Sequence, residues 1–332
     1  MVVSIDYQDR WKRVLDSDWY ENMFNIYSDV VKYTNEFYNI KGYHAAALPI
    51  TTTSISSPMG LGSDSVPVQI DLLGQKTYLA DSMQFLLEYT LRFNEKGVYY
   101  VMPSFRGEDT DERHLNQFYH SEVEIVGDLD DIIRLGEEYI KFLAKRIIEK
   151  DYYKTMDIDE DHLNTIKHVI SKDKFPRIRF SDAVTILEEN LPNGIGEKDG
   201  ITDINSLGEQ YLINKYEGAV WLTHFEHKSV PFYQQYDPED SRYALAADLL
   251  IGMGETIGSG ERADYISVQK SLREHQVSDE DYRWYIDMKK EFPLQTSGFG
   301  MGVERFIAWL TGNYDIRQIP VVYRDKNVKV DP

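Results

Sequence analysis

The stretch Gly298-Phe299-Gly300-Met301-Gly302-Val303-Glu304-Arg305 decides the fold of this chain. Its three glycines alternate with apolar residues, and an apolar helical pattern through Phe306, Ile307 and Leu310 follows at once. Glycine lets a backbone approach a ligand closely, and the N–H groups at a helix start attract anions. Arg305 falls in the first helical turn, where a cation opposes the helix dipole, and this indicates an anionic partner. Tight packing of a strand on a helix is the alternative explanation for the glycines.

Two acidic residues nearer the N-terminus are candidate ligands for a metal ion. Asp248 and Glu255 are separated by an apolar run that contains Gly252 and Gly254. If the strands on either side pair with each other, both carboxylates face one place, where they suit Mg²⁺. Arg262 follows a run of small residues and is positioned to point into a pocket. Two unrelated surface acids are the alternative.

A third group of polar residues lies between two strand-like runs, 98–105 and 117–126, which flank a highly charged loop. Arginine donates two parallel hydrogen bonds to phosphate through its planar fork, and an aromatic ring can stack on a base. These properties predict a site for a triphosphate, whereas chance charges on a solvated hairpin tip are the alternative. The candidate residues are Arg106, Glu108, Arg113, His114 and Phe118.

The remaining pattern predicts an α+β fold with an antiparallel sheet, because strands and helices alternate irregularly. Residues 18–40 are predicted to form a helix that Gly42 ends. Residues 44–53 are predicted to form a strand, and Pro49 within it favours a sheet edge or an interface. A hairpin is expected around Gly74, and the Ser-, Gly- and Pro-rich segment 54–67 is expected to be a mobile loop. Its residues 58–65 are expected to close over a site, with a fixed turn as the alternative. Further helices are predicted at 83–93, 131–150, 264–273 and 279–290, and further strands at 219–225, 243–251 and 255–257.

Composition sets limits on the class of protein. The chain has 332 residues, of which 42% are hydrophobic, and none is cysteine, so disulfides and cysteine-based zinc sites are excluded. The formal net charge of −20 disfavours broad contact with nucleic acid. No membrane span or signal segment is predicted, so a cytoplasmic location is expected. We expect one domain over residues 1–332, with a more polar elaboration at 151–215.

In this order and spacing, the three groups resemble the motifs of the class II aminoacyl-tRNA synthetases. Pro49 after the long helix is similar to the first motif of the family, which is a dimer interface. The segment from Phe105 to Glu124 is similar to the second motif, and Gly298 to Arg305 is similar to the third. The resemblance covers residues 18–325 and implies an antiparallel sheet flanked by helices, a homodimer, and ATP with Mg²⁺ as cosubstrate and cofactor.

The resemblance implies a role for each candidate residue. Arg106 would hold the α-phosphate, and Glu108, Arg113 and His114 would meet the rest of ATP. Phe118 and Arg305 would enclose the adenine beside Gly302, and Arg305 would also reach the γ-phosphate. Asp248 and Glu255 would hold magnesium. Arg106 and Arg305 would be catalytic, because they neutralise the charge that develops during adenylation.

Within the family the match is to the aspartyl and asparaginyl branch, as in Arg113-His114-Leu115 and Trp284-Tyr285-Ile286-Asp287. The resemblance assigns amino-acid binding to Ser82, Gln84, Glu88 and Arg262. Aspartyl enzymes have Lys-Gln where this chain has Leu87-Glu88, and asparaginyl enzymes have the glutamate. A glutamate accepts a hydrogen bond from an amide and repels a carboxylate, so asparagine is favoured over aspartate.

Two departures from the family pattern keep the function open. About 17 residues precede the first predicted long helix, where the family has an anticodon-binding barrel, so no anticodon recognition is expected and tRNA stays an open partner. The histidine usual before the third motif is Thr296 here. Three functions therefore remain: activation of asparagine with transfer to an unidentified acceptor, synthesis of asparagine from aspartate and ammonia, or regulatory binding without catalysis.

Overall fold

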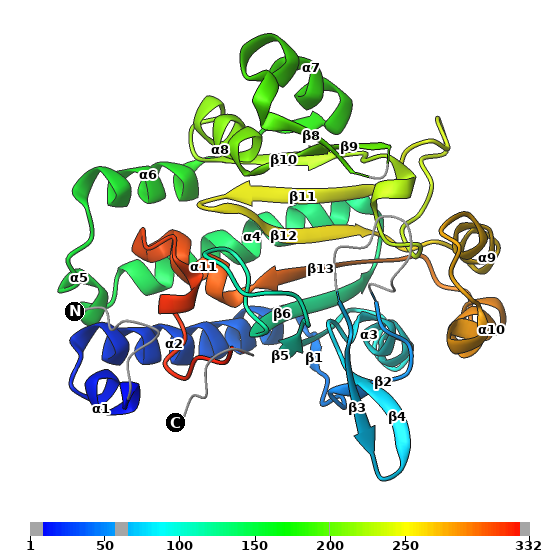
Figure 1. Ribbon diagram of the computed structural model, residues 1–332, viewed down its shortest axis with the longest axis horizontal. Helices are drawn as coiled ribbons and strands as arrows, with labels where there is room; N and C mark the ends of the chain where they lie inside the picture. The colour runs from blue at the N-terminus through cyan, green and yellow to red at the C-terminus, as the bar shows by residue number, and fades with distance from the viewer. Residues whose placement is uncertain (1–8, 57–65, 199, 326–332) are drawn as a thin grey trace.

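The computed structural model describes residues 9–56, 66–198 and 200–325. An eight-stranded sheet runs through its centre in the order β1-β5-β6-β13-β12-β11-β10-β7 (Figure 1). Neighbouring strands from β5 to β10 are antiparallel, whereas β1 and β7 pair in parallel at the two edges. The strands are β1 (His44–Ala45), β5 (Val98–Phe105), β6 (Gln117–Val126), β7 (Arg177–Arg179), β10 (Ala219–Thr223), β11 (Ala246–Ile251), β12 (Gly254–Glu261) and β13 (Thr296–Gly302).

Long helices cover one face of this sheet. Helices α2 (Asp18–Lys41) and α4 (Leu129–Ile148) pack against each other, and α4 also packs against β11, β12 and β13. Asp128 starts α4 with a capping box, in which its side chain and that of Asp131 satisfy backbone N–H groups of the first turn. Gly42 ends α2 in the left-handed conformation, with φ of 76°. Helix α11 (Val303–Thr311) continues directly from β13.

The other elements lie at the ends and on the opposite face of the sheet, except α1, which packs against α2. A small sheet with the order β2-β4-β3 projects below the main sheet in Figure 1, and α9 and α10 lie together at one end. These elements are α1 (Arg10–Leu15), β2 (Thr51–Thr52), β3 (Val68–Leu72), β4 (Gln75–Leu79), α3 (Gln84–Leu91), η2 (His227–Ser229), α9 (Tyr265–Glu274), η3 (Glu280–Tyr282), α10 (Arg283–Glu291) and η4 (Ile316–Gln318).

The polar stretch 151–215 contributes one strand to the main sheet and stacks further elements beside β10 (Figure 1). Strand β7 comes from this stretch and pairs with β10, so the stretch is continuous with the sheet. Its other elements are α5 (Asp151–Lys154), α6 (Glu160–Ser171), α7 (Phe180–Asn190), η1 (Pro192–Gly194), the hairpin β8 (Ile195–Lys198) and β9 (Ile201–Ile204), and α8 (Ser206–Lys215).

The α+β class and the antiparallel sheet predicted from the sequence are confirmed, but some element boundaries were wrong. The predicted strand 44–53 is reduced to β1 and β2 at its two ends, because Pro49 between them has no N–H to donate to a neighbouring strand. The strand predicted at 255–257 extends to Glu261, since β13 pairs with it from Ile257 to Glu261. The strand predicted from 243 begins at Ala246. The segment 58–65, which was predicted to close over the site, lies outside the described residues.

The alternating glycines of the opening stretch lie in β13, near the middle of the sheet. Their antiparallel partners on β6 are polar: Gly298 pairs with Glu124, Gly300 with Glu122 and Gly302 with His120. Because alternate residues of a strand face the same side, Phe299 and Met301 face the other way, into the core formed with the long helices. One side of β13 is therefore packed, and the other is bare backbone.

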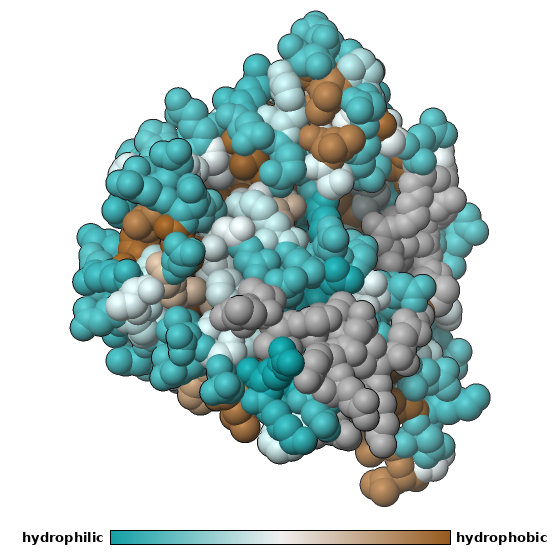
Figure 2. Space-filling model, turned by 60° about the vertical axis from the view of Figure 1, so that its left-hand side comes forward, coloured by the Kyte–Doolittle hydropathy of each residue, from teal (hydrophilic) through white to brown (hydrophobic). Residues whose placement is uncertain are grey.

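The surface outside this core is largely hydrophilic. Figure 2 shows one face on which apolar residues occur only in small, separated patches, in keeping with the net charge of −20. No helix in the three described ranges has both the length and the apolar character needed to cross a membrane.

Gly298→Ala tests whether the bare side of β13 is required by the fold. A Cβ at this position would lie 2.1 Å from Oε1 of Glu124, so we expect the variant to lose about 3 kcal/mol of unfolding free energy. Gly196→Ala in β8 is the matched control, because a Cβ there meets nothing within 4 Å. Urea unfolding of both variants measures the difference, and equal midpoints would contradict the packing described here.

Candidate active site

The open face of the sheet borders two adjoining cavities. The larger has a volume of about 390 Å³ and the smaller about 90 Å³. Arg106, His120, Glu255 and Gly300 line both, so the two spaces meet over the bare backbone of β13. Such a pair of connected pockets, one lined by cations and one by acids and neutral polar groups, suits a ligand that carries several functional groups.

The smaller cavity gathers most of the residues predicted to bind ATP: Arg106, Arg113, His114, Phe118, Glu255, Gly302 and Arg305. The guanidinium of Arg106 lies 5.5 Å from the centre of the Phe118 ring. Arg305 donates from Nη1 to the backbone oxygen of Glu255 at 2.5 Å, which fixes the start of α11 against β12. Glu108 was also predicted here, but it lines neither cavity, and its carboxylate accepts the N–H of Val66 at 3.0 Å.

Glu304 connects three of the elements that form the smaller cavity. Its carboxylate accepts the backbone N–H of Tyr119 at 3.0 Å and the hydroxyl of Tyr27 at 2.8 Å. Burial raises the pKa of Glu304 to about 7, and these hydrogen bonds oppose the shift. The carboxylate thus joins α11, β6 and α2 behind the residues that face the cavity.

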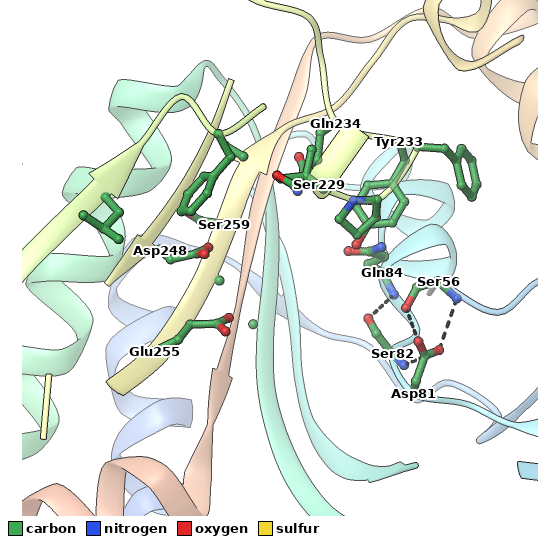
Figure 3. A pocket seen from close by; sticks show the side chains of 18 of the residues that line it. Ser56, Asp81, Ser82, Gln84, Ser229, Tyr233, Gln234, Asp248, Glu255 and Ser259 are labelled. Atoms are coloured by element: carbon green, nitrogen blue, oxygen red, sulfur yellow. Dashed lines mark hydrogen bonds between the residues drawn. The ribbon is translucent and has the colours of Figure 1, made fainter. Parts of the chain in front are cut away.

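The predicted acidic pair lies in the larger cavity. Asp248 on β11 and Glu255 on β12 point to the same side in Figure 3. Both approach the unfilled side-chain position of Gly258: a Cβ there would lie 2.7 Å from Oε1 of Glu255 and 3.6 Å from Oδ1 of Asp248. Burial and then the charge of Glu255 raise the pKa of Asp248 well above its usual range. Two carboxylates that repel each other in this way form a donor set that a divalent cation would stabilise.

Across the cavity from this pair, hydrogen bonds fix a row of small polar residues (Figure 3). Asp81 accepts the N–H and the hydroxyl of Ser56 at 3.1 and 2.9 Å, and also accepts the N–H of Ser82. Ser82 donates its hydroxyl to Glu122 at 2.7 Å, and Gln84 lines the cavity beside it. Ser82 and Gln84, two of the residues predicted to bind the amino acid, therefore both line the larger cavity.

Arg262 forms the end wall of the larger cavity and is paired with a buried carboxylate. Its Nε and Nη2 donate to Oε1 of Glu124 at 3.0 and 2.5 Å, and its Nη1 donates to Gln234 at 3.3 Å. Burial raises the pKa of Glu124 to about 7, although the charge of Arg262 opposes that shift. Above neutral pH, Arg262 therefore has its own counter-ion before any ligand binds.

Glu88 does not line the cavity, which corrects the expectation that it contacts the substrate directly. The side chain is fully buried behind the end wall. Its carboxylate accepts from Lys289 at 2.7 Å, from Thr296 at 3.1 Å and from the hydroxyl of Tyr285. Burial would raise the pKa of Glu88, but the charges of Lys289 and Arg262 outweigh it and lower that pKa, so Glu88 is an ionised partner of Lys289.

Comparison with known proteins assigns the chain to a family. The family described as tRNA synthetases class II (D, K and N) matches residues 3–323. The chain belongs to the class II tRNA synthetases. Members of this family are ATP-dependent ligases, and the antiparallel sheet flanked by helices is their catalytic fold.

Several relatives of this class II synthetase are named asparagine–tRNA ligases. That of Koribacter versatilis is 32% identical over 305 residues, which are 89% of this chain and 66% of the relative. That of Chloroflexus aurantiacus is 32% identical over 309 residues, which are 89% of this chain and 67% of the relative. The chain thus spans about two thirds of the length of these curated relatives.

Solved structures of the same kind share the fold. The asparaginyl-tRNA synthetase from Pyrococcus horikoshii, complexed with asparaginyl-adenylate, is 28% identical and has a TM-score of 0.85. The match covers 96% of this chain and 71% of that protein. The asparaginyl-tRNA synthetase of Entamoeba histolytica has a TM-score of 0.84 at 20% identity, which supports the fold alone.

Sequence reasoning missed two residues that contribute to the site, Lys289 and Glu209. Lys289 follows the quoted Trp284-Tyr285-Ile286-Asp287 segment closely, but nothing in that segment indicates that its target is Glu88. Glu209, which lines the larger cavity, lies in the polar elaboration where no motif drew attention. Both act across long stretches of sequence, so only the fold could reveal them.

Lys289→Met tests the buried pair. The variant leaves Glu88 charged and unpaired inside the protein, so we expect a loss of about 3–5 kcal/mol of unfolding free energy. Lys290→Met, which changes the exposed neighbour, is the matched control. Adding Glu88→Gln to Lys289→Met should recover part of the loss, because the unpaired charge is then removed. Urea unfolding is the measurement, and a Lys289→Met variant as stable as the control would refute the ion pair.

Proposed function

We propose that this synthetase activates asparagine: it uses ATP to form asparaginyl-adenylate and then transfers the acyl group. The observation that carries the proposal is the pair of cavities that meet over β13, with Arg106 and Glu255 lining both. The reaction needs an anion-binding space for ATP and a polar space for the amino acid, joined where the α-phosphate would lie. The α-carboxylate would attack the α-phosphorus, and pyrophosphate would leave.

The residues of the smaller cavity would bind and orient ATP. Arg106 and Arg305 would neutralise charge on the phosphates as the new bond forms, and this positioning supplies most of the rate. Phe118, whose ring lies beside the Arg106 guanidinium, would support the adenine together with Arg305. Arg113 and His114 would meet the phosphate tail, because they line the same cavity.

Magnesium would be held by Asp248 and Glu255. The crowding of these two carboxylates at Gly258, and the raised pKa of Asp248, fit a donor set that requires a cation. When bound, the metal would screen the phosphate charges. The protein contributes the orientation of both side chains from paired strands, with Asp248 directly opposite Gly258.

The charge balance at the end wall supports asparagine over aspartate. Arg262 is neutralised by Glu124, and Lys289 behind it is neutralised by Glu88. Around these pairs the lining is neutral, with Gln84, Gln234 and Tyr233. A substrate carboxylate would therefore enter without an uncompensated cation, whereas a side-chain amide can hydrogen-bond to neutral and charged groups alike. This disfavours the alternative of asparagine synthesis from aspartate and ammonia.

The acceptor of the acyl group is the part of the proposal that rests on relatives rather than on the site. The named relatives are tRNA ligases, which makes tRNA the first acceptor to test. Because this chain spans about two thirds of their length, a small-molecule or carrier acceptor is tested beside tRNA. The complete set of arginines in the cavities argues against a purely regulatory role.

Amino-acid-dependent ATP–pyrophosphate exchange tests the activation step. At pH 8 with Mg²⁺ and no tRNA, we expect exchange with asparagine to exceed that with aspartate at least about tenfold. The reason is that Arg262 and Lys289 already have carboxylate partners, Glu124 and Glu88, and offer no free charge to aspartate. Removal of Mg²⁺ should abolish the exchange. Aspartate-dependent exchange that yields asparagine when ammonia is added would instead establish the asparagine synthetase reaction.

Arg305→Ala is the site variant for this assay, and Arg242→Ala, on an exposed arginine paired with Asp240, is its matched control. Loss of one phosphate-neutralising arginine should lower the exchange rate about 10²- to 10³-fold, while the control stays at the wild-type rate. Full activity in Arg305→Ala would refute the assignment of the smaller cavity to ATP.

We also propose that the protein forms a homodimer through α2 and the neighbouring sheet edge. Phe24 and Val31 on α2 are 64% and 45% exposed, and β1 ends the sheet beside Pro49. Phe24→Glu should therefore shift the mass measured by light scattering from dimer to monomer, whereas Leu73→Glu at the tip of the β3–β4 hairpin should not. A wild-type protein that is monomeric at micromolar concentration would contradict the proposal.

A further inference from the structure

An ion pair connects the polar elaboration to the loop that carries the phosphate-binding candidates. Arg113 lies in the charged loop between β5 and β6, and its Nη2 donates to Oε2 of Glu209 on α8. The side chains are 25% and 15% exposed, so the contact is largely shielded from water. A shielded, charge-assisted hydrogen bond restricts an arginine far more than an exposed pair does.

The backbone beneath the pair is shaped to admit it. Both charged groups lie against Gly254, the first residue of β12, where a Cβ would be 2.5 Å from Nη2 of Arg113 and 2.6 Å from Oε2 of Glu209. Gly254 also has φ of +139°, a conformation that residues with a side chain rarely adopt. The position therefore has to be glycine for two independent reasons, and one of them is the ion pair.

Helix α8 presents Glu209 from a fixed position. The next residue, Gln210, donates its side-chain amide to the backbone oxygen of Gly252 at 2.8 Å, which ties the helix to the turn between β11 and β12. Asn205 caps the start of the helix. Gly208 packs so closely on η1 that a Cβ there would lie 2.4 Å from the oxygen of Gly194. These contacts fix the position of α8 and so restrict where the Glu209 carboxylate can lie.

The pair bridges the two cavities. Arg113 lines the smaller one with Arg305, and Glu209 lines the larger one with Asp248 and Glu255. Glu209 engages Nη2 of Arg113, while the Nε–H of the same guanidinium is buried and has no partner among the described residues. The arginine thus keeps an unused donor, and its side chain lines the smaller cavity, where the phosphate tail of ATP would lie.

We infer that Glu209 is a positioning residue for ATP: it fixes the Arg113 guanidinium on one side, so that its remaining donors are directed at the phosphates. The inference rests on the proposed function and adds to it a residue from the elaboration. An arginine on a loop loses rotamer freedom when it binds an anion, and a partner that has already ordered the side chain reduces that loss. Glu209 therefore lowers the Kd for ATP without touching the nucleotide.

A role for Glu209 as a third metal ligand is disfavoured by the geometry. Across residues 9–56, 66–198 and 200–325, no group of three or more histidine, aspartate or glutamate side chains is arranged to hold a metal ion. The Glu209 carboxylate is instead directed at Arg113. Asp248 and Glu255 remain the metal-facing pair.

Titration calorimetry with Mg·ATP, in the absence of amino acid, tests the inference on the full chain. Glu209→Gln should raise the Kd for ATP about tenfold, and Glu209→Asp should recover part of the affinity. Glu217→Gln, at an exposed carboxylate just beyond the same helix, is the matched control and should bind as the wild type does. In the Arg113→Ala background, adding Glu209→Gln should cause no further loss, since the arginine that it positions is gone.

Two results would overturn the inference. Unchanged affinity in Glu209→Gln would show that Arg113 needs no positioning, and a full additional loss in the Arg113→Ala background would show that Glu209 supports α8 instead. Binding of ATP with no amino-acid-dependent exchange in the wild type would refute the proposed activation and leave this inference intact. A wild-type protein that does not bind Mg·ATP would refute both.

Discussion

The pairing of β6 with β13 is the constraint on which the rest of the site depends. Its register sets Glu122 and Glu124 opposite Gly300 and Gly298, so each long acidic side chain has a strand neighbour with no side chain. The open side of the sheet is consequently deep enough for a ligand, while Phe299 on the other side closes the core. A slip by one residue would exchange these two faces and destroy both core and site.

The arginines of the site divide into two groups by how closely they are paired. Arg262 and Arg113 make direct hydrogen bonds to carboxylates, with Glu124 and Glu209. Arg106 and Arg305 have acidic side chains only at 3.9 Å. In an acidic protein this difference matters, because a cation that is loosely paired exchanges its partner for a phosphate at lower cost than one that is tightly paired. The loosely paired arginines are the two proposed to neutralise phosphate charge as the new bond forms, whereas Arg113 would keep its bond to Glu209 and meet the phosphate tail with its remaining donors.

Sequence alone predicted what depends on local pattern. The glycines of β13, the acidic pair and the charged loop were recognised because each is a short run whose spacing has a direct structural meaning. The placement of Glu88 was not predictable in this way. Its partner Lys289 lies 201 positions along the chain, and whether a carboxylate faces a cavity or a lysine depends on how two distant helices pack. Glu209 was missed for the same reason, since its partner lies on another loop.

Thr296 and Glu88, which nothing in the sequence connected, belong to one cluster. Thr296, at the position where the resemblance implied a histidine, donates its hydroxyl to Glu88, and Glu88 stands where aspartyl enzymes have glutamine. The hydroxyl of Thr296 and the ammonium of Lys289 both donate to Oε2 of Glu88, and the hydroxyl of Tyr285 donates to Oε1. In the proposed amino-acid pocket, these groups therefore balance one another's charge and hydrogen bonds behind the wall of the cavity. Under the proposed function, selection between an amide and a carboxylate would follow from the charge that this cluster leaves to Arg262, and not from direct contact with Glu88.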